Sequence, residues 1–245
     1  MTGLAVDDAA WASAWRRRAP GDKLLLCGGL VVSALVLPAW PGSVLVGVVA
    51  VVLALGPARV PARTFLRAVR WPSAFIAVGA LTAVVAVDGG GLGWAPDAAA
   101  RAGSLVGHAL AGSAAVLLLA TTTPMSDLLP ALRRARVPDA VVEVASVVYR
   151  LLFVLLSSMH TIREAQAARM GWSSLRRSYR SAGTLAAAVL TRSWDRARRM
   201  QEGLAGRGME TGLRVLPEVL PSSRAFLAAS LAGLAAIVAT SAVVA

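Results

Sequence analysis

The stretch from residue 139 to residue 210 begins DAVVEVASVVYRLLFVLLSSMHTIREAQAARMGW and ends RSWDRARRMQEGLAGRGME. It contains two long runs with helical periodicity, and each run closes on an Arg beside a Gly. Part of each run is apolar enough for a membrane, whereas the other part is cationic enough for an aqueous partner. We interpret the stretch as a segment that couples a membrane-embedded part of the chain to a soluble partner.

The composition of the whole chain is that of a membrane protein. Of its 245 residues, 57% are hydrophobic and 16% are charged, and the mean hydropathy is +0.66. Soluble domains are about 45–50% apolar and about 25% charged. Only helices and closed barrels satisfy their backbone groups in lipid, and the apolar runs here are continuous rather than alternating. The sequence therefore predicts an all-α, polytopic helical membrane protein that forms one membrane domain over residues 1–245.

The positions of the cations decide how the net charge of +12 is interpreted. Nucleic-acid-binding proteins gather their cations on one face, whereas cations that flank apolar segments act as topology signals. We therefore expect membrane lipid around this chain and no nucleic acid. The single Cys, Cys27, lies inside an apolar run, so it allows no intrachain disulfide and matches no metal-site spacing.

Five apolar segments are predicted to cross the membrane: 24–40, 43–56, 71–87, 102–121 and 225–244. The first is near the lower length limit for a span. Cations alternate between the connecting segments, with four in 16–23, none in 38–43, four in 57–70, one in 88–101 and sixteen in 133–224.

Cytoplasmic loops carry the excess of Lys and Arg. We therefore expect a multi-pass plasma-membrane protein with a cytoplasmic N-terminus and an external C-terminus. The predicted parts are a cytoplasmic N-terminal segment (1–22), four spans (23–121), a cytoplasmic coupling-helix segment (122–224) and a last span (225–245).

Three further expectations concern the membrane part. Trp11 and Trp15 are four residues apart, which predicts that both lie on one face of a helix as an interfacial anchor. His108 is expected to donate a hydrogen bond between helices rather than to bind a metal. The abundant Gly and Ala residues indicate either close helix packing or the base composition of the gene, and both interpretations stay open.

The coupling segment is expected to hold one short helix and two long ones. Ser126 or Asp127 is a candidate cap for the short helix, and Pro138 suits the start of the first long helix. Nothing breaks a helix between there and Arg169, a run of about 45 Å at 1.5 Å per residue. Gly171 is expected to stop this helix.

The second long helix is expected to start at Gly183 or Thr184 and to stop at Gly206-Arg207-Gly208. The basic connecting segment before it contains Arg176, Arg177 and Arg180. Arg150 lies in the apolar half of the first long helix, where it is expected to reach toward the membrane surface or to pair with a carboxylate or carbonyl.

Arg169 and Arg207 share a predicted setting, because each is an Arg at a helix C-terminus next to a Gly. One interpretation is that each Arg complements the helix dipole and the last carbonyl groups. The other is that a guanidinium at an exposed helix end binds a carboxylate in a groove of a partner through two parallel hydrogen bonds. The repetition at two helix ends favours the second interpretation.

The motifs AARMGW (167–172) and LAGRGME (204–210) resemble the paired Ala-Arg-Gly signatures of the transmembrane T component of energy-coupling-factor (ECF) transporters. RAPGDKLLL (18–26) resembles the start of the first span in that family. TTTPMSDLLPALRRARVPDAVVEVASVVYRLLFVLL (121–156) resembles its Thr-x-Thr-Pro to Tyr-Arg block. Within the family the chain is most similar to the CbiQ branch, which is associated with cobalt uptake.

The resemblance implies a non-catalytic scaffold that joins a substrate-binding membrane protein, the S component, to two ABC-type ATPase subunits. It also implies that two coupling helices transmit nucleotide-driven movement and that their terminal arginines dock in the ATPases. By position, the docking residues are Arg169 with Ala168 and Gly171, and Arg207 with Gly206 and Gly208. The chain departs from the family pattern at Met170, which precedes Gly171, and at Gly206, which replaces an Ala.

We expect no catalytic, cofactor or metal site in this chain. The only Lys is Lys23, so no phosphate-binding loop with a Lys is present. ATP hydrolysis is therefore expected on partner subunits, and cobalt on the S component.

Three alternatives stay open. The chain could be a general T component that serves vitamin-specific S components. It could instead be a membrane-bound enzyme, although that needs clustered acids and His. The third alternative is a structural membrane protein with a loop that binds nucleic acid or anionic lipid, in which Lys could replace the two terminal arginines.

Overall fold

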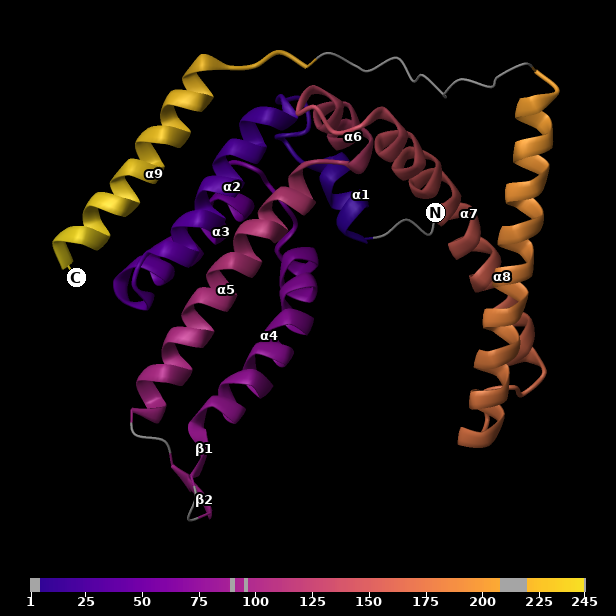
Figure 1. Cartoon of the computed structure of the whole chain (residues 1–245), viewed down its shortest axis with the longest axis horizontal. Helices are drawn as coiled ribbons and strands as arrows, with labels where there is room; N and C mark the ends of the chain where they lie inside the picture. The colour runs from indigo at the N-terminus through magenta and orange to yellow at the C-terminus, as the bar shows by residue number, and fades with distance from the viewer. Residues whose placement is uncertain (1–4, 89–90, 95–96, 208–219, 245) are drawn as a thin grey trace. The chain divides into compact units, whose positions relative to one another are not determined.

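A computed structural model describes residues 5–88, 91–94, 97–207 and 220–244 (Figure 1). The described residues form two units, of which one comprises residues 132–207 and the other comprises residues 5–131 together with 220–244. The second of these is a bundle of helices, and we call it the bundle.

The helices of the bundle are α1 (Ala5–Ala12), α2 (Pro20–Val36), α3 (Val44–Leu55), α4 (Ala62–Val84), α5 (Ala98–Thr122) and α9 (Arg224–Val244), with the irregular segment η1 (Ala39–Ser43) before α3. The helix α6 (Met125–Arg134) leads to α7 (Asp139–Ala168) and α8 (Leu175–Ala205). Two short antiparallel strands, β1 (Val85–Asp88) and β2 (Gly91–Trp94), connect α4 to α5. The all-α, polytopic fold class is confirmed, with this hairpin as a small addition.

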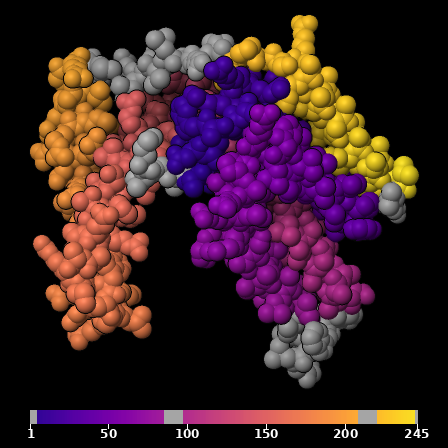
Figure 2. Space-filling view, turned by 180° about the vertical axis from the view of Figure 1, so that it is seen from behind, coloured from indigo at the N-terminus to yellow at the C-terminus, as the bar shows by residue number. Residues whose placement is uncertain are grey.

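Small residues lie at several points where the bundle helices meet, and several large apolar residues are exposed on its outside. The helix α5 lies against α2, α3 and α4, and α9 lies beside α2 (Figures 1 and 2). Where the helices meet, Ala34, Ala50 and Ala115 are fully buried, whereas Val36 and Phe75 are 76% and 80% exposed. A soluble protein would bury these large side chains, so this distribution is the one expected in lipid.

Close helix packing is one reason for the Gly and Ala content. A Cβ atom added to Gly29 in α2 would overlap the side chain of Leu234 in α9. Gly47 in α3 faces Ala111 in α5, where a Cβ atom would make an ordinary contact of 3.6 Å. Small residues at these positions let the helices approach each other closely.

Three helices within the described part of the chain are long and apolar enough to cross a membrane, namely α5, α7 and α9. The helix α2 has 17 residues, which is near the lower limit for a span, and residues 39–55 form a shorter apolar segment. The prediction of five spans therefore stays a prediction, and α7 is an additional helix that meets the criterion of length and composition.

His108 makes the predicted hydrogen bond between helices. Its Nε2 lies 3.1 Å from the carbonyl oxygen of Leu37, and its Nδ1 lies 2.7 Å from that of Ser104 in its own helix. Leu37 follows the last residue of α2, where carbonyl groups have no partner within the helix. The imidazole of His108 therefore connects the end of α2 to α5.

The third predicted span has different limits. The helix α4 starts at Ala62, so Arg63, Arg67 and Arg70 lie on a helix rather than in the predicted loop. Its helical part ends at Val84, and the remaining residues of the predicted span belong to β1. The pattern of charges indicates a change of polarity along the chain, but it does not report where a helix begins.

The prediction for the two N-terminal tryptophans was wrong. Trp11 lies in α1 and is 43% exposed, with the Arg16 guanidinium 3.9 Å from its ring centroid. Trp15 lies beyond the end of α1 and is buried against Phe226 of α9 in an edge-to-face contact, with 5.3 Å between ring centroids. This tertiary contact, rather than a shared helix face, fixes Trp15.

Candidate functional site

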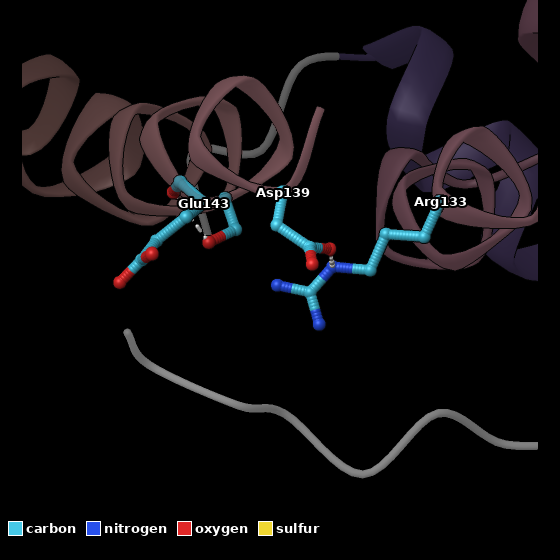
Figure 3. Close-up of polar contacts among 4 residues, drawn as sticks. Arg133, Asp139 and Glu143 are labelled. Atoms are coloured by element: carbon cyan, nitrogen blue, oxygen red, sulfur yellow. Dashed lines mark hydrogen bonds and ion pairs between the residues drawn. The ribbon is translucent and has the colours of Figure 1, made fainter. Parts of the chain in front are cut away.

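The first coupling helix, α7, begins where the sequence predicts. Pro138 is its N-cap, and the carbonyl of Pro138 accepts the N–H groups of Val141 and Val142. The Arg133 Nε lies 3.4 Å from a carboxylate oxygen of Asp139 across the α6–α7 connection (Figure 3). Asp139 is largely exposed, so this pair orients the connection more than it stabilises it.

The predicted cap of the short helix was wrong. The helix α6 starts at Met125, so Ser126 and Asp127 lie inside its first turn. The carbonyl of Pro124 accepts the N–H of Asp127 at 3.0 Å, while the Ser126 hydroxyl donates to the Asp127 carboxylate at 3.2 Å. Pro124 therefore occupies the position before the helix that was assigned to a polar side chain.

The end of α7 is closed by Met170 rather than by Gly171. Met170 has a φ of 57°, the left-handed conformation that helices usually give to Gly. The N–H of Gly171 donates to the carbonyl of Gln166 at 2.8 Å, and the N–H of Met170 donates to that of Ala167 at 3.0 Å. These two bonds define a Schellman motif, so the helix ends in a regular way despite the departure from the family pattern.

Gly171 is required for a different reason, which is close packing. A Cβ atom at this position would lie 2.8 Å from both the carbonyl oxygen of Gln166 and the hydroxyl oxygen of Ser181. The Ser181 hydroxyl donates to the Gly171 carbonyl at 2.9 Å, and the Gln166 amide donates to Ser181 and Thr184. These contacts hold the end of α7 against the first turns of α8.

The second coupling helix starts earlier than predicted. The helix α8 begins at Leu175, and the Ser174 hydroxyl accepts the N–H of Arg177 at 3.4 Å as its N-cap. The predicted connecting segment, which contains Arg176, Arg177 and Arg180, is therefore the first part of α8. Gly183 and Thr184 lie inside the helix, where Thr184 bonds Gln166 rather than capping a new helix.

The sequence reasoning missed the polar contacts among Gln166, Ser181 and Thr184, which come from two different helices. One local signal was available for the start of α8, since a Ser before a long amphipathic run favours an N-cap. For the contacts between helices, no signal was available without knowing how the chain turns at residues 169–174.

We expect the Met170→Gly variant to be more stable than the wild type. A non-Gly residue in the left-handed conformation costs about 1–2 kcal/mol, and Gly removes that cost. Differential scanning fluorimetry in detergent should therefore show a higher melting temperature for Met170→Gly. Met159→Gly serves as the control, because Met159 lies inside α7, where Gly destabilises a helix. An unchanged or lower melting temperature for Met170→Gly would contradict the assigned cap.

Both predicted docking arginines lie at exposed helix ends. Arg169 is the residue that follows Ala168, the last residue of α7, and its side chain is exposed. Arg207 follows Gly206 at the end of α8 and is also exposed. Gly206 has ordinary helical angles (φ −64°, ψ −16°), a conformation that Ala adopts equally well. Gly208 lies outside the described residues.

The two arginines lie at opposite ends of α8. Gly171, two residues after the first Arg, contacts Ser181, and Arg207 follows the C-terminus of the same helix. At 1.5 Å per residue, this separation is on the order of 40 Å along the helix. One small partner domain cannot reach both ends easily, so the arrangement suits two separate binding surfaces.

The helix α8 has no buried residue within the structure. Tyr179, Leu190 and Trp194 are 87%, 69% and 73% exposed, although each is large and apolar or aromatic. Arg198 pairs with Glu202 at 3.0 Å on the exposed surface of the helix. A long amphipathic helix with its apolar side uncovered indicates a contact surface for another molecule.

Arg150 of α7 is also exposed. This agrees with the expectation that its long side chain reaches away from the apolar helix. Within the described parts of the chain, no group of three or more His, Cys, Asp or Glu side chains is arranged to hold a metal ion. The exposed groups named above on α7 and α8 include guanidinium groups and large apolar side chains.

Comparisons with known proteins agree on one family. A family model for CbiQ, described as cobalt transport protein, matches residues 12–217. The cobalt transport protein CbiQ of Rhodobacter capsulatus is 38% identical over 216 residues, which cover 88% of each chain. CbiQ of Salmonella typhimurium is 30% identical over 213 residues, which cover 82% of this chain and 93% of the relative.

A longer relative carries a compound name. The putative fused cobalt transport protein CbiMQ of Methanocorpusculum labreanum is 25% identical over 226 residues. The match covers 87% of this chain but 37% of that protein.

Proposed function

The chain belongs to the CbiQ family of cobalt transport proteins, and on that premise we propose that it is the T component of an ECF-type importer. In this role it links two ABC-type ATPase subunits to a substrate-binding S component in the plasma membrane. It has no catalytic role of its own, and its partners hydrolyse ATP.

The observation that carries this proposal is the position of Arg169 and Arg207. Each guanidinium is exposed at the end of a long helix, and the two lie on the order of 40 Å apart along α8. A planar guanidinium at such a place can donate two parallel hydrogen bonds to one carboxylate. Two distant sites of the same chemistry fit two copies of one kind of ATPase subunit, each with an acidic groove.

The helices that carry these arginines also suit a link between two environments. In the first half of α7, Val141, Val144 and Val148 are all more than half exposed and lie at helical spacing. We assign this apolar half to the membrane or to the S component, and the cationic end of α7 together with α8 to the cytoplasm. Residues 122–224 are then the coupling-helix segment, although α7 by itself is apolar enough to cross a membrane.

The bundle is consistent with a cytoplasmic N-terminus. The start of α2 and the end of α5 lie together, because the amine of Lys23 donates to the carbonyl of Thr122 at 3.0 Å. These ends are the start of the first predicted span and the end of the fourth. Because four spans return the chain to the side from which it started, both ends lie on one face of the membrane. The cations near both ends assign that face to the cytoplasm.

Cobalt is the proposed cargo because the family and both full-length relatives are named for cobalt transport. The name of the fused relative joins CbiM and CbiQ in one chain, which supports a separate membrane partner for this protein. We assign the binding of cobalt to that partner, the S component. A general T component that serves vitamin-specific S components is the near alternative, and the cargo distinguishes the two.

The test is co-purification. The tagged chain is expressed with its candidate ATPase and S subunits, extracted in mild detergent and analysed for bound proteins and for metal. We expect both partners to remain bound and cobalt to be enriched in the complex. Enrichment of a vitamin instead would favour the general T component. A chain that purifies only with anionic lipid would overturn the proposal in favour of a lipid-binding membrane protein.

A further inference from the structure

Asp22 and Lys23 are adjacent charged residues that are both buried, with 5% and 0% of their surfaces exposed. They lie in the first turn of α2. Buried charges in a bundle of apolar helices cost free energy unless they make specific hydrogen bonds. The bonds that these two residues make lead to places in the chain about 100 and 200 residues away.

Lys23 holds the end of α5. Its Nζ donates to the carbonyl oxygen of Thr122, the last residue of that helix. The last carbonyl groups of a helix have no partner within it, and they form the negative end of the helix dipole. A buried ammonium group therefore suits this position, and it fixes the point at which the chain leaves the bundle toward α6.

Asp22 holds the start of α9. One carboxylate oxygen accepts the Ser222 hydroxyl at 3.0 Å, and the other accepts the backbone N–H of Ser223 at 2.9 Å. The Ser223 hydroxyl in turn accepts the N–H of Phe226 at 3.4 Å in the first turn of α9. A carboxylate suits the positive end of this helix dipole, and it fixes the point at which the chain returns to the bundle.

The two coupling helices lie between these two points in the sequence. All of α7 and α8 is inserted between Thr122 and Ser222, and both of these residues are bonded to neighbouring residues of one turn of α2. On the basis of the proposed function, we propose that Asp22 and Lys23 form a clamp. It holds together the two ends of the coupling segment, at Thr122 and at Ser222, which we call its stems. Movement of α7 and α8 then displaces the bundle as one body instead of bending the stems.

Asp22 and Lys23 are positioning residues in this scheme, because they touch neither the ATPases nor the cargo. Their loss should separate ATP hydrolysis from transport. A merely structural role would lower the amount of folded protein without changing the ratio of cobalt imported to ATP hydrolysed. That ratio is therefore the informative quantity.

The test uses Lys23→Met in the complete complex, reconstituted in liposomes. We expect the ATPases to remain bound and to hydrolyse ATP, while cobalt uptake per ATP falls about tenfold, within the range of typical coupling effects. Ser43→Ala is the matched control, because it also removes a buried side-chain bond to a backbone carbonyl, at Ala34, away from both stems. Its uptake per ATP should equal that of the wild type. A normal ratio in Lys23→Met would overturn the inference.

A second experiment applies if Lys23→Met does not fold. Asp22→Cys and Ser222→Cys are combined in a Cys27→Ser background and joined by a short thiol-specific cross-linker. Because Asp22→Cys removes the carboxylate that bonds Ser222 and Ser223, untreated protein should import less cobalt per ATP, and the cross-linker, which joins residues 22 and 222 again, should restore the ratio. A normal ratio in untreated protein, or no recovery on cross-linking, would overturn the inference. If the wild-type chain retained no ATPase, the proposed function would fail, and this inference would fail with it.

Discussion

Replacing both Arg169 and Arg207 with Glu is expected to abolish cobalt uptake and to release the ATPase subunits, while the chain still inserts into the membrane. Each Glu would face the carboxylate that the guanidinium is proposed to bind, so attraction becomes repulsion. Truncating one member of a desolvated charge pair at an interface costs about 2–5 kcal/mol. Loss at both arginines should therefore release the subunits.

The single variants make the prediction sharper. Because the two arginines lie at opposite ends of α8, each should bind its own ATPase subunit. Arg169→Glu or Arg207→Glu alone should therefore weaken retention of the ATPases without abolishing it. Arg→Lys at both positions should also impair uptake, because an ammonium group cannot donate two parallel hydrogen bonds.

The matched control is the double variant Arg192→Glu/Arg199→Glu. It makes the same change in net charge on exposed positions of α8, but away from the helix ends. We expect it to retain the ATPases and to transport. Normal transport by the Arg169→Glu/Arg207→Glu variant would defeat the assignment. Equal loss in the control would show that the overall charge of α8 matters, as in the binding of anionic lipid.

The positions of these arginines could be predicted from the sequence because the signals there are local. No Gly or Pro interrupts residues 139–168, so the length of α7 and the place of Arg169 follow from the absence of helix breakers. The start of the second helix was harder to predict. Gly183 suggested a boundary, but a Gly inside a helix costs only about 1 kcal/mol, and the contacts of Gln166 across the turn favour one continuous α8.

The features that the sequence did not indicate depend on contacts between distant residues. Trp15 is buried because Phe226 lies against it, and no pattern around residue 15 reports on α9. The same holds for the clamp, because the sequence Gly21-Asp22-Lys23 by itself indicates only the charged start of a membrane span. The bonds of Asp22 and Lys23 become visible only when the ends of α5 and α9 are placed beside α2.

The closed turn between α7 and α8 leads to the second large prediction, which concerns Gly171→Val. A Cβ atom at this position would lie 2.8 Å from two oxygen atoms, one on each helix. The Gln166 oxygen belongs to the backbone, and the Ser181 hydroxyl would have to give up its bond to the Gly171 carbonyl to move away. Overpacking of this kind typically costs about 1–3 kcal/mol. The turn also places Arg169, two residues earlier, relative to α8. We therefore expect loss of uptake together with faster tryptic cleavage near the turn.

Gly183→Ala is the matched control for this variant. Gly183 lies in α8, two residues after Ser181, and a Cβ atom there would meet nothing within 4 Å. Ala should stabilise the helix by about 0.5–1 kcal/mol and leave uptake unchanged. If Gly171→Val resisted trypsin like the wild type yet failed to transport, Gly171 would itself contact the ATPase. If it transported normally, the precise placement of Arg169 would not matter, and docking would depend on charge alone.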